Sequence, residues 1–269
     1  MKLRNGISGL LLLLLLVCSS AAWTEPITFD IDNQGWEQAY IGRPAGTTYD
    51  QIFPVSGADW RASGGNPDGN IYQNAMGSDQ RSYWMGYKGA DNFLGDLTGR
   101  YLQTDIYSTG NWQTLANGSN GDDGNVYARW VIANKLDNGN YNMFVSNQDA
   151  SIDINSFTDW TTSSITLEKE NFFRWPNMAD NSQDFSEVLQ DYDSIGLYIF
   201  SGTDVLSNIN GGIGTWNSTS QLLHYGAFSS DGNTATWALD NFQAKPVPEP
   251  ATLLLFGTGL LGLAGIRKK

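Results

Sequence analysis

Two glutamates separated by one residue are the clearest candidates for acid–base chemistry in this sequence. Glu168 and Glu170 would project from the same face of an extended strand, because side chains alternate between the two faces. Glycosidases use two carboxyl groups about 5–10 Å apart. The pair is therefore a candidate catalytic pair of a glycoside hydrolase or lyase. The alternative is a solvated strand edge, of which two glutamates around Lys169 are also typical.

A nucleophilic triad has little support in the sequence. His224 is the only histidine, so a Ser-His-Asp triad would have to use it. The chain lacks the Gly-x-Ser-x-Gly motif that presents a serine nucleophile in many hydrolases. We therefore expect no catalytic residues and no enzyme activity, with the glutamate pair as the alternative.

Acidic residues near the two ends of the body are candidates for a structural Ca²⁺ site. Asp30 and Asp32 begin a stretch that resembles the start of an EF-hand loop, but position twelve is Ile41, where an EF-hand needs a glutamate. In jelly-roll folds the first and last strands lie together, which would bring Asp30 or Asp32 near Asp240. The alternative is that these residues only form turns. No other cofactor is expected.

Tryptophans in polar surroundings are candidates for sugar binding. The chain has 10 tryptophans, and several have Gly, Asn or Pro nearby. An indole face can stack on a sugar ring while amide and carboxylate groups bond its hydroxyls. The ligand-binding candidates are Trp112, Trp175 and Trp216, and packing in the core or in loops is the alternative for each.

The elements that must position these side chains are mainly short strands. Apolar residues alternate from Val126 to Ile132 and from Ile195 to Ile199, and Asn138-Gly139 precedes a further strand as a hairpin signal. Thr234–Phe242 predicts a last strand. We expect an all-β fold, an antiparallel two-sheet β-sandwich of the jelly-roll type.

One short helix is predicted within this all-β body. Asp184 and Glu187 have the spacing of a capping box. The residues that follow the cap place an apolar stripe on one face, at positions Phe185, Val188, Leu189 and Tyr192.

The charge distribution excludes one class of partner. The formal net charge is −13, and five of the 15 Lys and Arg residues lie at the two ends of the chain. The remaining 10 cations face 28 anions, which gives the middle of the chain a charge of −18. Such a surface repels phosphate backbones, so nucleic acid is not an expected partner.

Residues 1–22 have the composition of a secretory signal peptide. Lys2 and Arg4 precede the apolar run 10–17, and small residues follow up to Ala22. We expect signal peptidase to cleave after Ala22, and an uncleaved membrane anchor is the alternative. Cleavage removes Cys18, the only cysteine, so the mature body would contain neither disulfides nor zinc-thiolate sites.

The last residues, 246–269, combine an extended motif, an apolar span and a basic end. The segment begins with Pro246, Pro248 and Pro250, continues with the uncharged residues 251–266, and ends with three cations. As a helix, the uncharged span would be about 24 Å long, enough for a slightly thinned bilayer. We expect a C-terminal transmembrane helix with its cations on the cytoplasmic side, and the body on the outer side.

This arrangement closely resembles the PEP-CTERM sorting signal of Gram-negative bacteria. The residues that carry the resemblance are Pro248, Glu249, Pro250, Arg267, Lys268 and Lys269. It implies cleavage by an exosortase, a membrane-embedded transpeptidase-like enzyme, in a bacterium that makes exopolysaccharide. A plain C-terminal anchor is the alternative.

The body, residues 23–245, also resembles the laminin B (laminin IV type A) domain. The resemblance lies in the order of short phrases, which include residues 64–71, 93–97, 159–162 and 239–242. The chain departs from that pattern in extra Gly- and Asn-rich material at 110–125 and 202–220. The resemblance implies a jelly-roll interaction module rather than a catalyst.

Together these patterns predict an exported protein that passes through an inner-membrane intermediate to the cell surface or extracellular matrix. Its sandwich is expected to be a non-catalytic module that binds exopolysaccharide. The alternatives are a secreted glycan-active enzyme that uses the glutamate pair, and a purely structural envelope protein.

Overall fold

The computed structural model describes most of the body. The described residues are 25–76, 84–87, 93–109, 112–114, 126–147, 152–153, 159–176, 178–201, 215–217, 222–224, 227–229 and 234–247. The predicted signal peptide and most of the predicted sorting signal lie outside these ranges. Within them, no helix is long and apolar enough to cross a membrane.

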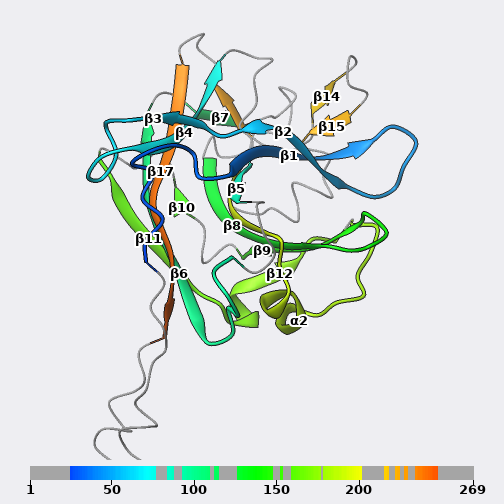
Figure 1. The fold of residues 1–269 in the computed structure, drawn as a ribbon. Helices are drawn as coiled ribbons and strands as arrows, with labels where there is room; N and C mark the ends of the chain where they lie inside the picture. Colours follow the sequence, from blue (N-terminus) through cyan, green and yellow to red (C-terminus); the bar gives the residue numbers. More distant parts are fainter. Residues whose placement is uncertain are drawn as a thin grey trace, which may run out of the picture.

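Two antiparallel sheets face each other across the core (Figure 1). The larger sheet contains, in spatial order, β12 (Phe172–Arg174), β9 (Tyr141–Ser146), β8 (Val126–Lys135), β13 (Ser194–Ser201), β5 (Trp84–Tyr87), β1 (Trp36–Pro44), β15 (Leu222–His224) and β14 (Thr215–Asn217), with β10 (Ile152–Asp153) paired to β8 and β2 (Gln51–Gly57) paired to β1. The predicted antiparallel sandwich is therefore confirmed.

The second sheet carries the features that matter most for the site. Its strands, in spatial order, are β11 (Thr161–Thr166), β6 (Arg100–Thr109), β17 (Thr234–Pro246), β4 (Asn70–Met76) and β3 (Asp59–Arg61). A separate pair is formed by β7 (Trp112–Thr114) and β16 (Ala227–Ser229).

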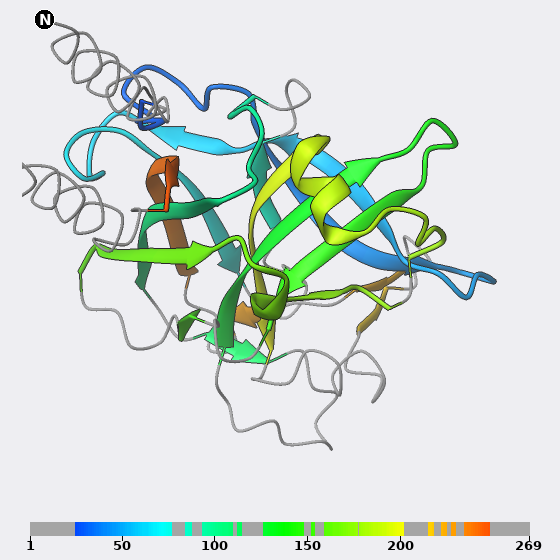
Figure 2. The ribbon, with the colours of Figure 1, turned by 90° about the horizontal axis from the view of Figure 1, so that it is seen from below.

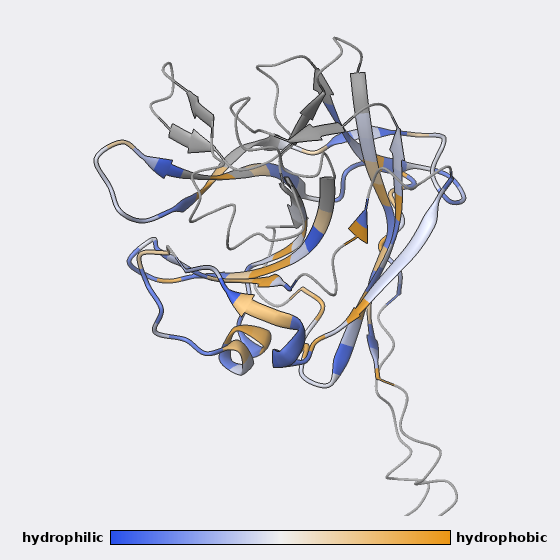
Figure 3. Ribbon diagram, turned by 180° about the vertical axis from the view of Figure 1, so that it is seen from behind, coloured by the Kyte–Doolittle hydropathy of each residue, from blue (hydrophilic) through white to orange (hydrophobic). Residues whose placement is uncertain are grey.

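The main core lies between the sheets and follows the period-two patterns in the sequence. Ala128, Trp130 and Ile132 of β8 enter it from one side, and Trp237 and Leu239 of β17 enter it from the other. Figure 3 shows hydrophobic residues recurring along the facing strands of both sheets. A second buried cluster lies on the opposite face of the larger sheet, where Val131, Met143 and Tyr198 take part.

The predicted helix is present as α2 (Phe185–Gln190), beside strands β8 and β9 (Figure 2). Both halves of the capping box form, because Asp184 accepts from the Glu187 N–H and Glu187 accepts from the Asp184 N–H. Phe185 packs on Phe144 of β9, with ring centroids 5.1 Å apart. The stripe predicted from the sequence therefore closes this end of the core.

The two ends of the described body meet at strand β17. Ile27 and Phe242 form an antiparallel bridge with hydrogen bonds of 2.8 and 3.1 Å in the two directions. This contact confirms the expected pairing of the first and last segments of the body. It also places Phe29 next to Asp240 in space.

Candidate functional site

The outer face of the five-stranded sheet is polar and aromatic. In β6, Leu102 and Ile106 point into the core, so Tyr101, Asp105 and Tyr107 point to the opposite face. The registers of β17 and β11 add Asp240 and Thr162 beside Asp105. The sheet therefore gathers carboxylate, hydroxyl and aromatic groups on one face.

Asp105 and Asp240 lie directly opposite each other on neighbouring strands. Both are buried, although they are on the outer face. The Thr162 hydroxyl donates to Asp105 at 2.5 Å, and the Asn241 side-chain amide donates to Asp105 at 2.8 Å. Asn241 has a positive φ of 52° and sits where the register of β17 shifts, so an irregularity in the strand turns this amide toward Asp105.

A loop at residues 62–69 covers the two carboxylates. The Asn66 N–H donates to Asp240 at 2.6 Å, and the Asn66 side-chain amide donates to Asp105 at 3.2 Å. A Cβ at Gly65 would lie 2.0 Å from the Gly69 carbonyl oxygen and 2.8 Å from the Asp240 carboxylate. Glycine at 65 therefore allows two close approaches, of the loop to its own backbone at Gly69 and of the loop to the Asp240 carboxylate.

The environment of Asp240 raises its pKa to about 6, mainly because burial disfavours the charged form. The neighbouring Asp105 acts in the same direction, while hydrogen bonds from the backbone N–H groups of Asn66, Asn241 and Phe29 act against it. Asp240 thus joins three segments: the loop, its own strand and the start of the body. Its role in this geometry is to hold the loop in place.

An aromatic pair lies beside this loop. The rings of Trp160 and Tyr107 have centroids 5.6 Å apart, and both side chains are half-buried. The Trp160 indole N–H donates to the Gly64 carbonyl at 3.1 Å, which ties the indole to the loop. Exposed polar residues of the loop and of the outer face of β11 accompany the pair, and they are Asn66, Asp68 and Thr162. We call the aromatic pair and these three residues the Trp160 surface.

The predicted sugar-binding tryptophans do not form one site in the described residues. Trp112 lies in β7 and Trp216 in β14, and their side chains are outside the described part. Trp175 is 0% exposed. A sugar ring cannot reach its faces in this structure, so the prediction of a stacking role for Trp175 does not fit the fold.

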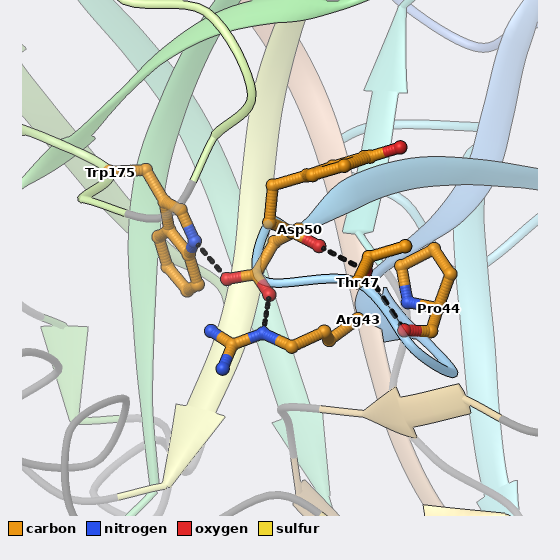
Figure 4. A network of polar contacts seen from close by, with 6 residues as sticks. Arg43, Pro44, Thr47, Asp50 and Trp175 are labelled. Atoms are coloured by element: carbon orange, nitrogen blue, oxygen red, sulfur yellow. Dashed lines mark hydrogen bonds and ion pairs between the residues drawn. The ribbon is translucent and has the colours of Figure 1, made fainter.

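Trp175 instead belongs to a buried polar network (Figure 4). Its indole N–H donates to one Asp50 oxygen at 2.8 Å, and the Arg43 Nε donates to the other at 2.9 Å. The Thr47 hydroxyl donates to the Pro44 carbonyl at 2.9 Å in the turn between β1 and β2. The network fastens that hairpin to the segment after β12, which is a structural role.

The predicted calcium ligands are only partly brought together. Asp30 and Asp32 are exposed in a turn, where Asp30 accepts from the Thr28 hydroxyl and Asp32 from the Gln34 N–H. Asp240 is 1% exposed and accepts from backbone N–H groups. In the described part of the chain, no group of three or more His, Cys, Asp or Glu side chains is placed to hold a metal ion. Calcium stays a prediction.

The glutamate pair is not on a strand, which corrects the sequence prediction. Strand β11 ends at Thr166, and the 3₁₀-helix η3 (Lys169–Asn171) follows it. Glu168 is the residue before η3 and Glu170 lies within it, and both are exposed. A turn therefore replaces the shared strand face. His224 lies in β15, opposite Gly42, and its side chain is outside the described residues.

Residues that sequence reasoning missed form the centre of this site. Asp105, Asn66 and Trp160 were not among the predicted ligands, yet they lie together with Asp240. One signal was present, since the phrases at 64–71, 159–162 and 239–242 carried the resemblance to a jelly-roll family. These three phrases, far apart in the sequence, meet at the loop and at its support.

The comparisons with known proteins concern the C-terminal signal and the fold. Residues 246–269 match the model of the PEP-CTERM protein-sorting motif, which confirms the predicted sorting motif. No curated protein matches the chain. The resemblance to the laminin B domain is not shown by these comparisons and stays a prediction.

Among solved structures, the chain is similar to carbohydrate-binding modules. The solution structure of CtCBM11 is 16% identical, with a TM-score of 0.41, and the similarity covers 86% of this chain and 99% of that one. The family 11 module of a Clostridium thermocellum cellulosomal cellulase is 15% identical, with a TM-score of 0.40 and coverage of 84% and 97%. An exo-beta-agarase is 14% identical, with a TM-score of 0.40 and coverage of 85% and 26%.

Proposed function

We propose that this chain is an exported surface or matrix protein whose sandwich binds an exopolysaccharide through the Trp160 surface. In this account signal peptidase removes residues 1–22, residues 246–269 hold the chain in the membrane, and an exosortase then cleaves within them. The match of residues 246–269 to the sorting motif supports the route.

The Trp160 surface is the observation that carries the binding proposal. The Trp160 and Tyr107 rings offer apolar faces for a sugar ring, and Asn66, Asp68 and Thr162 offer hydrogen-bonding groups for its hydroxyls. The Asp105–Asp240 network fixes the loop beforehand, so little ordering is needed when a ligand binds. Since the body is acidic, a neutral or cationic glycan suits it better than an anionic one.

Two substitutions at Trp160 test the proposal. Trp160→Ala removes the stacking face and should weaken binding at least about tenfold, which corresponds to about 1.4 kcal/mol. Trp160→Phe keeps a ring but loses the bond to Gly64, so binding should fall less. The probes are a glycan array and the purified exopolysaccharide of the producing bacterium, measured by titration calorimetry, with circular dichroism as the check on folding.

The outcomes separate the alternatives for the body. If glycan binding is about tenfold weaker in Trp160→Ala but not in Trp160→Phe, the result supports the Trp160 surface as the binding site. Equal binding in all three proteins places any glycan site elsewhere, with Trp112 and Trp216 as the next residues to replace. An absence of binding to every probe favours a purely structural envelope protein.

The glycan-active enzyme requires its own test. Glu168→Gln combined with Glu170→Gln should leave sugar release from the exopolysaccharide unchanged, because both residues are exposed beside or within a turn rather than aligned across a cleft. Reducing-sugar assays of wild type and double variant measure this. Release by the wild type that disappears in the variant would establish catalysis by the pair.

A further inference from the structure

Strand β17 runs directly into the sorting signal. The matched motif begins at residue 246, and β17 ends at Pro246, which pairs with Arg100 of β6. The next residue, Val247, still donates its N–H to the Gly99 carbonyl at 3.1 Å. The body is therefore held by sheet and turn hydrogen bonds up to the motif, with no free linker between them.

The tether from the body to the apolar span is short. Only Pro248, Glu249 and Pro250 separate Val247 from the uncharged residues 251–266. Four Cα–Cα steps reach at most about 14 Å.

The chain leaves the body at one end of the sandwich. In Figure 1 strand β17 runs beside β6, and its last described residues leave at the lower end, where α2 also lies. We call this the exit end and define it by the turn 96–99, Arg100, residues 168–170 and residues 245–247. Strand β6 starts here at Arg100 and ends at Thr109, about 30 Å away at roughly 3.3 Å per residue.

The charge of the exit end differs from that of the whole chain. Its cations are Arg100, Lys169 and Lys245, and its anions are Asp96, Glu168 and Glu170. Asp184 and Glu187 of α2, which lies at the same end beside Lys169, add two further anions, so three cations face five anions and the net charge is −2, while the chain as a whole carries −13. An anionic lipid surface therefore repels the acidic remainder of the body more strongly than it repels this end.

We propose that in the uncleaved protein the exit end rests against the outer surface of the membrane, with β6 and β17 standing away from the bilayer. The inference rests on the proposed membrane span of residues 251–266. The tether is shorter than half the length of β6, so the exit end has to stay within about 14 Å of the lipid. The charge difference then keeps the remaining acidic surface in solution.

Two matched cysteine variants test this orientation. Thr98→Cys lies in the turn at the exit end and Thr109→Cys lies at the far end of β6, and both positions are exposed. Each is made in a Cys18→Ser background, because Cys18 is the only native cysteine. The full chain is produced in a host without an exosortase, labelled with a fluorophore and reconstituted in phosphatidylethanolamine/phosphatidylglycerol vesicles that contain a headgroup quencher.

The expected result is at least twofold stronger quenching at Thr98→Cys than at Thr109→Cys. Insertion of twelve Gly and Ser residues between Val247 and Pro248 should remove most of that difference. Equal quenching at both ends in a chain that floats with the vesicles overturns the orientation but not the membrane span. A chain that does not float overturns both, so the two failures are distinguishable.

Discussion

At the level of single residues, Asp240 gives the fold a specific pH dependence. Its folded-state pKa of about 6 lies above the ordinary value of 3.8, so the folded protein holds the proton more tightly than the unfolded chain. This contribution to stability is complete below about pH 4 and is lost as the pH rises through about 6. Its size is at most about 3 kcal/mol.

Asp240→Asn should remove that pH dependence. The amide has one acceptor oxygen where the carboxylate accepts from several backbone N–H groups, so the variant should also lose about 1–3 kcal/mol of stability. Urea unfolding from pH 4 to pH 7 measures both effects. The stability difference between wild type and variant should shrink as the pH rises, and parallel curves would show that Asp240 does not titrate in this range.

Asp96→Asn is the control, because Asp96 contributes a pH dependence of stability opposite in sign to that of Asp240. Hydrogen bonds from the Thr98 side chain and N–H lower the pKa of Asp96, so its contribution is present above the unfolded pKa and lost as the pH falls.

Trp175 and Asp50 provide a second prediction at the residue scale. Trp175→Phe keeps a large ring but removes the donor to a buried carboxylate. The free energy of unfolding should fall by about 1–3 kcal/mol. Glycan binding should not change, since the ring is fully buried. Calorimetric titration measures glycan binding, and urea unfolding measures stability. Weaker glycan binding at unchanged stability would indicate that Trp175 contacts the ligand.

At the level of elements, the loop at residues 62–69 depends on glycine for two different reasons. Gly65→Ala would place a Cβ against backbone oxygen at 2.0 Å and should cost more than about 2 kcal/mol. Gly64→Ala meets no atom within 4 Å and has only its positive φ of 84° to accommodate, about 1 kcal/mol. Thermal unfolding of both variants measures the difference, and equal costs would contradict the close contact between Gly65 and Gly69 within the loop.

Elements with local signals could be predicted from the sequence, and the candidate site could not. The capping box at Asp184 and the hairpin turn at Gly139 involve residues a few positions apart, and both form as expected. Asn66 and Asp240 are 174 positions apart. Their contact depends on a strand register and on an irregularity near Asn241 that no local pattern reveals.

At Glu168 and Glu170 the sequence predicts an element that the structure does not contain. The sequence pattern predicts a strand that continues past Thr166, but the backbone turns there into η3. The helix η3 has three residues, which make a single 3₁₀ turn, so it is too short to show a helical period in the sequence.

At the level of the whole molecule, the proposed export route of the acidic body rests on the two ends of the chain. The sorting motif was predictable because its three parts are contiguous, and the family model matches the same residues. What the body binds was not predictable to the same degree, because binding depends on surfaces assembled from distant strands. The export route of the protein and the ligand of its body therefore need separate experiments.

The intact mass of the native protein, purified from the producing bacterium together with its cell fraction, tests the central claim most directly. If both ends are processed, the protein is found at the surface or in the matrix, starts at Trp23, keeps β17 and lacks the terminal Arg267, Lys268 and Lys269. A protein of full C-terminal mass that dissolves without detergent would contradict this claim.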